Sequence, residues 1–319
     1  MLRFLTNGVK YTMPLLNLKP YIEDADARGY AIGCFNIINL ESLDGVLKAA
    51  ENLSSPVCIA FHPPHFKYTD IEVISNAVKT AASKTQVPVI LHLDNARDSS
   101  QVINAIKYGF TSIMYIGNPE MDFKTKTEKT RNISEIVHAA GIMLESDIFL
   151  RQKVPKLPDI DSWNLEYIES AIDFCDKTGI DIISADIVRE VAINGRKEQI
   201  IDIGLLQRIK SETKKYLSLH GGSGIPDDIL KQAFSAGLNK MHIYGRSAEM
   251  ALSKIKDLVN RSNADLIEVM QEQRESFRKV VEKSINVFGS TNKAVNLEIV
   301  NEITKAILNK LSNGFTKIS

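Results

Sequence analysis

The stretch Tyr216–Pro226 reads YLSLHGGSGIP, and it joins an apolar run to a glycine-rich turn that ends at a proline. Glycines let backbone N–H groups approach an anion closely, and Ser223 can donate a hydroxyl group. Pro226 stands where a helix would begin, and the dipole at a helix N-terminus attracts negative charge. The stretch therefore predicts a strand, an anion-binding turn and a helix, in that order.

A short apolar run followed by a longer amphipathic segment recurs along the whole chain, as is typical of βα units around a parallel sheet. The predicted strands are Ala31–Asn36, Val57–His62, Val89–Asp94, Ser112–Ile116, Met143–Asp147, Ile182–Asp186, Tyr216–His220 and Lys240–Ile243. The amphipathic segments between them are Leu40–Leu53, Ile71–Lys84, Ser100–Tyr108, Ile133–Ala140, Leu165–Thr178, Ile203–Thr213 and Asp227–Ala236. Eight repeats of this length predict an α/β protein with a closed (β/α)8 barrel, rather than an open doubly wound sheet.

The barrel is assigned to residues 13–260, and residues 1–12 form a short N-terminal extension. Three mainly helical segments follow the last strand, Ser247–Asn260, Asp265–Phe288 and Asn296–Leu311. Since one repeat needs only one helix, residues 261–319 are expected to form a C-terminal helical extension that packs on the barrel or on a partner subunit. The longest loop, Arg151–Trp163, is either a mobile lid or a solvated connector.

The charge balance argues for a small partner molecule. Lys and Arg together number 39, as do Asp and Glu, so the chain lacks the positive field that would hold nucleic acid or an anionic membrane. The three widely spaced cysteines, Cys34, Cys58 and Cys175, fit reduced thiols better than a disulfide framework. No apolar run reaches the ~20 residues of a membrane span, and Met1–Thr12 lacks a signal-peptide pattern. We therefore expect a cytoplasmic protein.

Polar residues stand at the ends of most predicted strands. They are Asn36, His62, Asp94, Asn95, Glu145, Asp147, Asp186, His220 and His242. The C-terminal strand ends of a barrel meet at one mouth, so these side chains are expected to converge. Such a set could bind a metal ion or transfer protons on a polar substrate. Gly245 and Arg246, after the last strand, are expected to add to the anion-binding turn.

Five groups of residues carry a resemblance to a known family. They are Ala31–Asn36 with Leu40-Glu41, His92-Leu93-Asp94, Gly109–Met114, His220–Gly224 and Val287–Ser290. Together they resemble the class II fructose-bisphosphate and tagatose-bisphosphate aldolases, over nearly the whole chain from Met13 onward. The resemblance implies a barrel that forms a homodimer or homotetramer and cleaves ketose bisphosphates into dihydroxyacetone phosphate and an aldehyde. It also implies a zinc ion that polarises the ketone and an aspartate that moves a proton at the aldehyde oxygen.

Site residues follow from this resemblance position by position. Asp94 corresponds to the proton-transferring aspartate, and His220 to one of three zinc-binding histidines. Gly221 and Ser223 correspond to phosphate ligands. The full set expected to bind the substrate or its phosphate is Asn36, Gly221, Gly222, Ser223, His242, Gly245 and Arg246.

The zinc site that the resemblance implies is degraded in this chain. Asn95 stands at the second histidine position, and Val191 or Ala192 at the third. An amide is a poor zinc ligand and an aliphatic side chain is none, whereas catalytic zinc normally has three protein ligands. Further departures lie at Ile116, Asp147, His242 and Gly245. Ordinary zinc-dependent activity is therefore not expected, and the cofactor stays open.

Three interpretations of the altered site are compatible with the sequence. The first rebuilds a metal site, and its candidate ligands are His220, His242, Glu145, Asp147, Asp186, His62 and His65. A carboxylate-rich set would suit Mg²⁺ or Mn²⁺ better than zinc. The second needs no metal and uses Arg189, Arg246 or a Schiff base on Lys240. In the third, the barrel binds a sugar phosphate without turning it over.

The favoured function is carbon–carbon lyase activity, in aldol, retro-aldol or related enol chemistry, on a phosphorylated or otherwise anionic carbonyl compound. Its catalytic residues are Asp94 as the acid–base group, His220 and Arg189. The alternative is a non-catalytic paralogue that binds sugar phosphates on the same barrel. A purely structural role comes third, and it predicts no thermal shift with any phosphate or carboxylate ligand.

Overall fold

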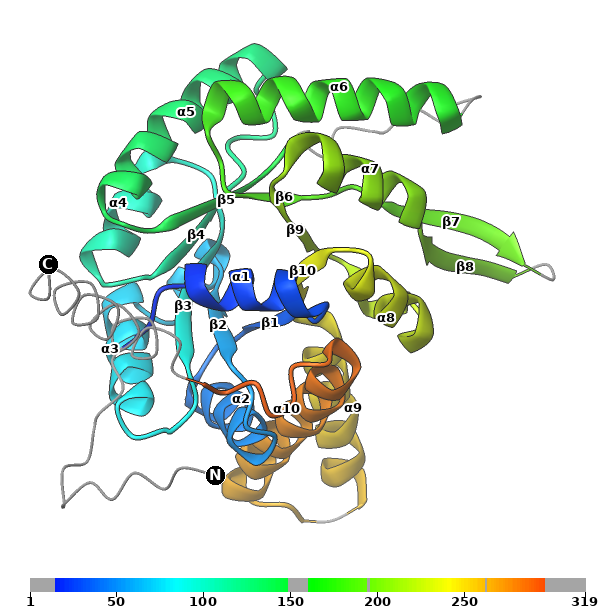
Figure 1. Ribbon diagram of the computed structural model, residues 1–319. Helices are drawn as coiled ribbons and strands as arrows, with labels where there is room; N and C mark the ends of the chain where they lie inside the picture. The colour runs from blue at the N-terminus through cyan, green and yellow to red at the C-terminus, as the bar shows by residue number, and fades with distance from the viewer. Residues whose placement is uncertain (1–14, 149–159, 194–195, 262, 296–319) are drawn as a thin grey trace, which may run out of the picture.

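A closed barrel of parallel strands organises the computed structural model, which describes residues 15–148, 160–193, 196–261 and 263–295 (Figure 1). The strands are β1 (Ile32–Asn36), β2 (Val57–Phe61), β3 (Val89–Ala96), β4 (Ser112–Tyr115), β5 (Met143–Asp147), β6 (Ile182–Ser184), β9 (Tyr216–Leu219) and β10 (Leu238–Ile243). They pair in the order β1-β10-β9-β6-β5-β4-β3-β2. The predicted (β/α)8 barrel is confirmed, and each predicted strand overlaps an observed one.

Helices follow the strands around the outside of the barrel. They are α2 (Leu40–Asn52), α3 (Ile71–Ala82), α4 (Ser99–Lys107), α5 (Phe123–Ala139), α6 (Ile160–Thr178), α7 (Ile203–Thr213), α8 (Asp227–Ser235) and α9 (Gly245–Arg261), with short 3₁₀ turns η1 (Pro63–Lys67) and η2 (Gly222–Gly224). Helix α5 begins ten residues before the predicted start at Ile133. The Asp122 side chain accepts a hydrogen bond from the Thr125 N–H and caps that start, although the first turns carry few apolar residues.

A helix that the sequence analysis did not predict, α1 (Lys19–Arg28), closes the N-terminal end of the barrel. Its buried residues Tyr21, Ile22 and Ala25 pack in one cluster with Cys34 and Ile90 from the barrel strands. Only three of its ten residues are buried, which is too sparse a pattern to stand out as an amphipathic helix. With this end covered, the barrel opens at the C-terminal strand ends.

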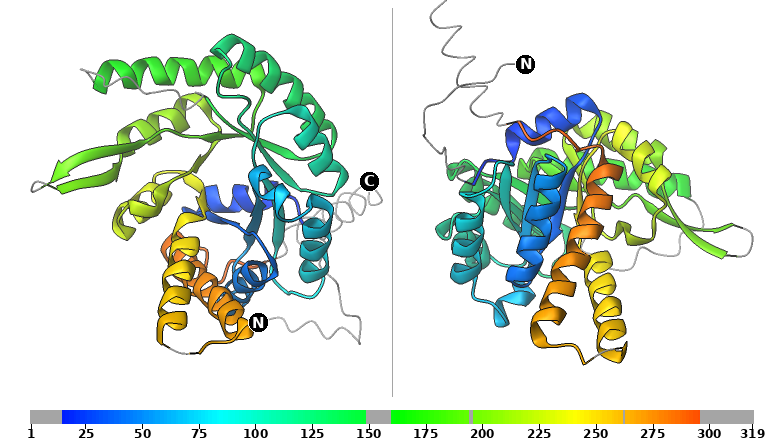
Figure 2. Two further views of the ribbon diagram at one scale, coloured as in Figure 1. Left: turned by 180° about the vertical axis from the view of Figure 1, so that it is seen from behind. Right: turned by 90° about the horizontal axis from the view of Figure 1, so that it is seen from below.

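The segment after the last repeat packs on the side of the barrel. Helix α10 (Leu266–Phe288) lies against α2 and α9 (Figure 2). The Phe288 carbonyl accepts a hydrogen bond from the Ala31 N–H at 3.0 Å, just before β1. A Cβ added at Gly45 of α2 would lie 2.5 Å from the Arg274 carbonyl oxygen, so the two helices need glycine at this contact.

Several sequence predictions fall on residues that the structure does not describe. The N-terminal extension of residues 1–12 and the helical segment Asn296–Leu311 lie outside the described residues. So do residues 151–159 of the predicted loop, whereas α6 begins at Ile160. The domain boundaries at residues 13 and 261 stay predictions.

An antiparallel hairpin projects from the barrel after β6 (Figure 1). It consists of β7 (Val188–Ile193) and β8 (Arg196–Ile201), and the sequence analysis did not predict it. The register pairs Val188 with Ile201 and Ile193 with Arg196. The sequence between the two strands is Asn-Gly, the dipeptide that most strongly favours a two-residue hairpin turn, so the sequence does carry a signal for this hairpin.

Candidate active site at the barrel mouth

Glu145 on β5 is the centre of a buried polar network inside the barrel. Its Oε2 accepts a hydrogen bond from the Lys240 Nζ at 2.6 Å, and its Oε1 accepts one from the Ser218 hydroxyl at 2.6 Å. The same Oε1 lies 3.0 Å from His242 Nε2 and 3.4 Å from His220 Nε2. Since β5 and β10 are not neighbours in the barrel, the contact between Glu145 and Lys240 crosses its interior.

Lys240 is held as a charged ammonium group. Burial favours its neutral form, but the neighbouring Cys34, Glu145 and Cys58, together with the hydrogen bond to Glu145, outweigh burial and raise the pKa of Lys240 above its ordinary value. Burial raises the pKa of Glu145, but the Lys240 ammonium, His242 and the hydrogen bonds from His220 and His242 together outweigh burial, so that this pKa lies well below its usual range. A fully buried, protonated lysine is a poor nucleophile, so the geometry does not support a Schiff base on Lys240.

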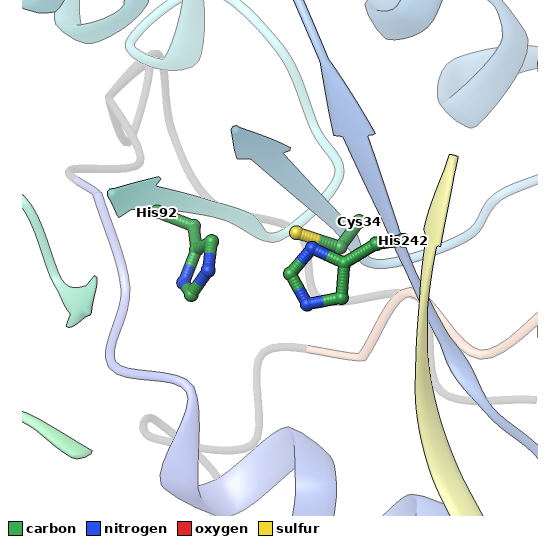
Figure 3. Close-up of side chains that lie close together, drawn as sticks. All are labelled: Cys34, His92 and His242. Atoms are coloured by element: carbon green, nitrogen blue, oxygen red, sulfur yellow. The ribbon is translucent and has the colours of Figure 1, made fainter. Parts of the chain in front are cut away.

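A first group of possible metal ligands lies deep in the barrel. Cys34 on β1, His92 on β3 and His242 on β10 point toward one another (Figure 3), and one donor atom from each lies within 4.8 Å of the others. However, the Lys240 Nζ lies 3.3 Å from His92 Nε2, and His92 Nδ1 is 2.8 Å from the Ser112 hydroxyl. Because an ammonium group already occupies the space beside His92, this group is unsuited to a cation.

Asp94 lies near the end of β3, and only one of its two carboxylate oxygens has a hydrogen-bond partner. Its Oδ2 accepts a hydrogen bond from the Asn36 side chain at 2.8 Å. Its Oδ1 is buried, has no hydrogen-bond partner and lies 3.7 Å from His242 Nδ1, which is equally buried and unpartnered. Burial raises the pKa of Asp94, but the nearby histidines His242, His220 and His92 and the hydrogen bond from Asn36 together outweigh burial, so that this pKa lies below its ordinary value.

The two histidines of the mouth form a stacked pair beside this carboxylate. The ring centroids of His220, directly after β9, and His242, on β10, are 3.7 Å apart and the rings are nearly parallel. Burial, followed by His220 and Lys240, lowers the pKa of His242 to about 4, so its imidazole is neutral at pH 7. Asp94, His220 and His242 form a second group whose donor atoms lie within 4.8 Å of one another. Two imidazoles and a carboxylate suit a divalent cation, so the donor chemistry fits a metal here.

A cavity of about 130 Å³ opens over this group. Its walls are Asn36, Asp94, His220, Gly221, Gly222, His242, Ile243, Tyr244, Gly245 and Arg246. Gly221 has φ +73°, a left-handed conformation that favours glycine, and an added Cβ would have no neighbour within 4 Å, so the backbone conformation and not the space requires glycine there. The Arg246 guanidinium donates to the carbonyls of Gly222 and Ile225 at 3.2 and 3.1 Å, and so it braces the turn from one side.

The structure therefore gathers most of the predicted site residues around one cavity. Asp94, His220, and the predicted anion-binding residues apart from Ser223 all line it. Ser223 lies in η2, and its side chain is outside the described part of the structure. Asn95 follows Asp94 with φ +58°, a conformation that asparagine adopts more readily than most residues.

Other predicted site residues lie apart from the cavity. Arg189 is on β7, where its Nη1 donates to the carbonyls of Asp186 and Val188, and it does not line the cavity. Asp147 forms an ion pair with the buried Lys126 of α5 and is likewise absent from the cavity walls. Val191 lies on the hairpin, paired in register with Glu198. His62 and His65, whose ring centroids are 5.6 Å apart, lie near the mouth, with Tyr244 5.4 Å from His65.

Sequence reasoning missed the part that His92 and Ser218 take in the network. A usable signal was the two-residue period of a strand, which puts His92 on the same face as Asp94, and Lys240 on the same face as His242. Such spacing would have placed all four side chains inside the barrel.

The fold and the mouth together define a (β/α)8-barrel protein whose strand ends carry an aspartate, two histidines and a glycine turn. Residues 16–293 match the family model of class II fructose-bisphosphate aldolase, and the chain belongs to this family. The resemblance stated from the sequence is confirmed. The family consists of lyase-type enzymes, which supports the predicted class of enzyme, and its members are generally zinc-dependent.

Similar proteins cover almost the same length. The chain is 28% identical over 289 residues to a sulfofructosephosphate aldolase from Alkalicoccus urumqiensis, a match covering 88% of this chain and 99% of the relative. It is 28% identical over 299 residues to a fructose-bisphosphate aldolase from Thermus caldophilus, covering 86% and 97%. The crystal structure of the YdjI aldolase from Escherichia coli K12 matches with a TM-score of 0.75 and 27% identity, covering 88% of this chain and all of that one. In the described residues, no helix is long and apolar enough to cross a membrane.

Proposed function

We propose that this protein is a carbon–carbon lyase that cleaves or forms an aldol bond in a phosphorylated or otherwise anionic carbonyl compound, and that it acts in the cytoplasm. The observation that carries the proposal is the cavity shared by the Asp94 carboxylate and the glycine turn at Gly221. The Asp94 carboxylate can remove or return a proton, and the glycine turn offers backbone N–H groups to an anion.

Phosphate binding is proposed for the turn side of the cavity. Gly221 and Gly222 would present backbone N–H groups, and the start of α9 at Gly245 lines the same cavity beside them. Arg246 contributes positive charge while bracing the turn through its two carbonyl contacts. The printed names of the relatives, a sulfofructosephosphate aldolase and fructose-bisphosphate aldolases, support a ketose phosphate as the substrate class.

Asp94 is proposed as the acid–base group of the reaction. In the cleavage direction, the hydroxyl group beside the breaking carbon–carbon bond gives up its proton as the aldehyde forms, and the ionised Asp94 accepts it. The electron pair of the broken bond moves into the carbonyl of the other fragment as an enediolate. A divalent cation, when bound at the mouth, polarises that carbonyl. His220 is proposed as the inherited metal-binding histidine, whereas Asn95 and Val191 replace the other two.

The proposal is tested by comparing the wild-type protein with Asp94→Asn. Cleavage of ketose phosphates, followed by coupled detection of the aldehyde, is expected to fall at least 100-fold in the variant, in line with loss of a general acid–base. The thermal shift produced by a ketose phosphate should survive, because the glycine turn is unchanged. Turnover that persists in Asp94→Asn would overturn the assigned role.

A non-catalytic paralogue is the alternative, and the same assays separate it from the lyase. It predicts that wild-type protein shows thermal shifts with sugar phosphates but turns over none of a broad panel, with divalent cations present or absent. Such a result would contradict the lyase proposal. If instead the wild-type protein turns over one member of the panel and Asp94→Asn abolishes that turnover, the alternative is contradicted.

A further inference from the structure

The family resemblance implies zinc-binding histidines at two positions that hold other residues here, Asn95 and Val191 or Ala192. It does not imply a histidine at position 242, where this chain has one. His242 occupies a position on β10 from which its imidazole reaches the stacked His220 and the Asp94 carboxylate. We propose that this chain holds a borderline divalent cation such as Zn²⁺ through His220, His242 and Asp94, a ligand set that differs from the one implied by the family resemblance. The proposal concerns metal binding itself and stands whether or not the protein is a lyase.

Two unsatisfied atoms point to a ligand at this position. Asp94 Oδ1 and His242 Nδ1 are both buried and have no hydrogen-bond partner, although they lie 3.7 Å apart. Leaving two such atoms unpaired is costly, so native proteins rarely do so without a bound ion or water. At 3.7 Å they are too far apart for a direct hydrogen bond, but a cation about 2.0–2.2 Å from each would satisfy both.

Glu145 fixes which ring nitrogen of each histidine is available. Its Oε1 lies 3.0 Å from His242 Nε2 and 3.4 Å from His220 Nε2, so each ring can donate its Nε2–H to this carboxylate oxygen. The proton is then absent from Nδ1, and the Nδ1 lone pair of His242 faces Asp94. A carboxylate that accepts the far N–H of a metal-binding histidine is the usual support of such a ligand.

The charges at the mouth favour a cation there and not deeper in the barrel. Lys240 pairs with Glu145 at 2.6 Å, whereas Asp94 accepts a hydrogen bond from the Asn36 amide through Oδ2 and has no partner for Oδ1 among the described residues. The deeper group of Cys34, His92 and His242 lies against the Lys240 ammonium, which would repel a metal. Coordination through Oδ1 also leaves Oδ2 of Asp94 to accept a proton.

Direct cation binding tests the proposal without substrate. Metal-free wild-type protein titrated with Co²⁺, followed by visible absorption and calorimetry, should bind one equivalent. His220→Asn and His242→Asn should each weaken binding at least about tenfold, the lower end of losses seen even for residues that only support ligands. Cys34→Ala, which removes a donor only from the deeper group, should leave the affinity within about twofold, and no thiolate-to-cobalt band should appear.

Three results would overturn the assignment. They are no Co²⁺ or Zn²⁺ binding by wild-type protein, affinity that is unchanged in both histidine variants, and affinity that falls in Cys34→Ala. Circular dichroism shows whether each variant is folded, and His242→Gln offers a second replacement should His242→Asn fail to fold. Failure of lyase activity with intact Co²⁺ binding would reject the proposed function alone, and turnover by protein that binds no cation would reject the metal site alone.

Discussion

Single residues in the barrel interior are constrained by the charges of their neighbours. Lys240 would be a candidate nucleophile from its position in the sequence, but its contact with Glu145 at 2.6 Å keeps it protonated. The same contact makes each partner necessary to the other, because both side chains are fully buried. Removing one leaves an isolated charge in a medium that solvates it poorly.

Lys240→Met is therefore expected to lower the free energy of unfolding by about 3–5 kcal/mol, the cost typical of breaking a buried ion pair from one side. Urea denaturation followed by circular dichroism measures the loss. The double variant Lys240→Met with Glu145→Gln should recover a large part of it, since no unpaired charge remains. If the double variant is as unstable as the sum of the two single variants, the pair does not act as a unit.

Lys240 also allows a chemical test of the metal-free alternative. Borohydride reduction in the presence of a ketose phosphate is expected to leave Lys240 unmodified, because its ammonium group has no free electron pair to attack a carbonyl. Peptide mass spectrometry checks this result. A reduced adduct on Lys240 would restore the Schiff-base interpretation.

At the level of elements, the position of the additional helix α10 depends on the close approach of its backbone to the backbone of α2. A side chain at position 45 would meet the carbonyl of Arg274 rather than a movable side chain, so α10 could not keep its distance from α2. The position of α10 matters for the barrel because α10 ends at Phe288, whose ring stacks on Phe35 of β1 with the ring centroids 6.4 Å apart.

Gly45→Ala should destabilise the protein by about 1–3 kcal/mol through overpacking, despite the higher helix propensity of alanine. Thermal unfolding gives the comparison. Gly204→Ala in α7 is the matched control, since its added Cβ would have no neighbour closer than 3.6 Å, and it should cause no loss. Equal stability of Gly45→Ala and wild type would show that α10 can move away from α2 without cost.

At the scale of the whole molecule, the hairpin is an addition to a barrel that is closed without it. The Asp202 N–H donates to the Ile187 carbonyl at 2.9 Å, which joins the base of the hairpin beside the barrel. The hairpin still affects the mouth, because the Gln199 side chain would lie 2.6 Å from a Cβ added at Gly224. It thus covers one side of the anion-binding turn.

Replacing residues 189–200 by Asn-Gly, between the paired Val188 and Ile201, is expected to leave the barrel folded and the Co²⁺ affinity unchanged. Affinity for inorganic phosphate should fall several-fold, because the turn loses its packing against Gln199. Circular dichroism and calorimetry separate the two effects. The variant also removes Arg189, so undiminished turnover would contradict the catalytic role predicted for that residue, which lies on β7 away from the cavity walls.

Periodicity predicted the barrel, because its strands are short apolar runs at regular intervals, and the glycine pattern predicted a turn directly after β9, while anion binding by Gly221 and Gly222 stays a prediction. The helix α1 escaped prediction since few of its residues are buried, and the hairpin because its local signal is a single dipeptide, Asn194-Gly195. Asp94, His220 and His242 could be predicted as strand-end residues. The stacking of the two histidines and the neutralisation of Glu145 by Lys240 depend on contacts across the barrel, which no local pattern encodes.

The pairing of β1 with β10 has a consequence for the synthesis of the chain. Ile32 of β1 pairs with Lys240 of β10. Because Lys240 leaves the ribosome about 200 residues after Ile32, this pairing cannot form until roughly 10–40 s later at ordinary rates of translation. Throughout that time one edge of β1 has no partner strand, and such an edge is open to pairing with another nascent chain. The yield of folded protein should therefore depend on translation speed and on chaperones that shield β1 until the final strand arrives.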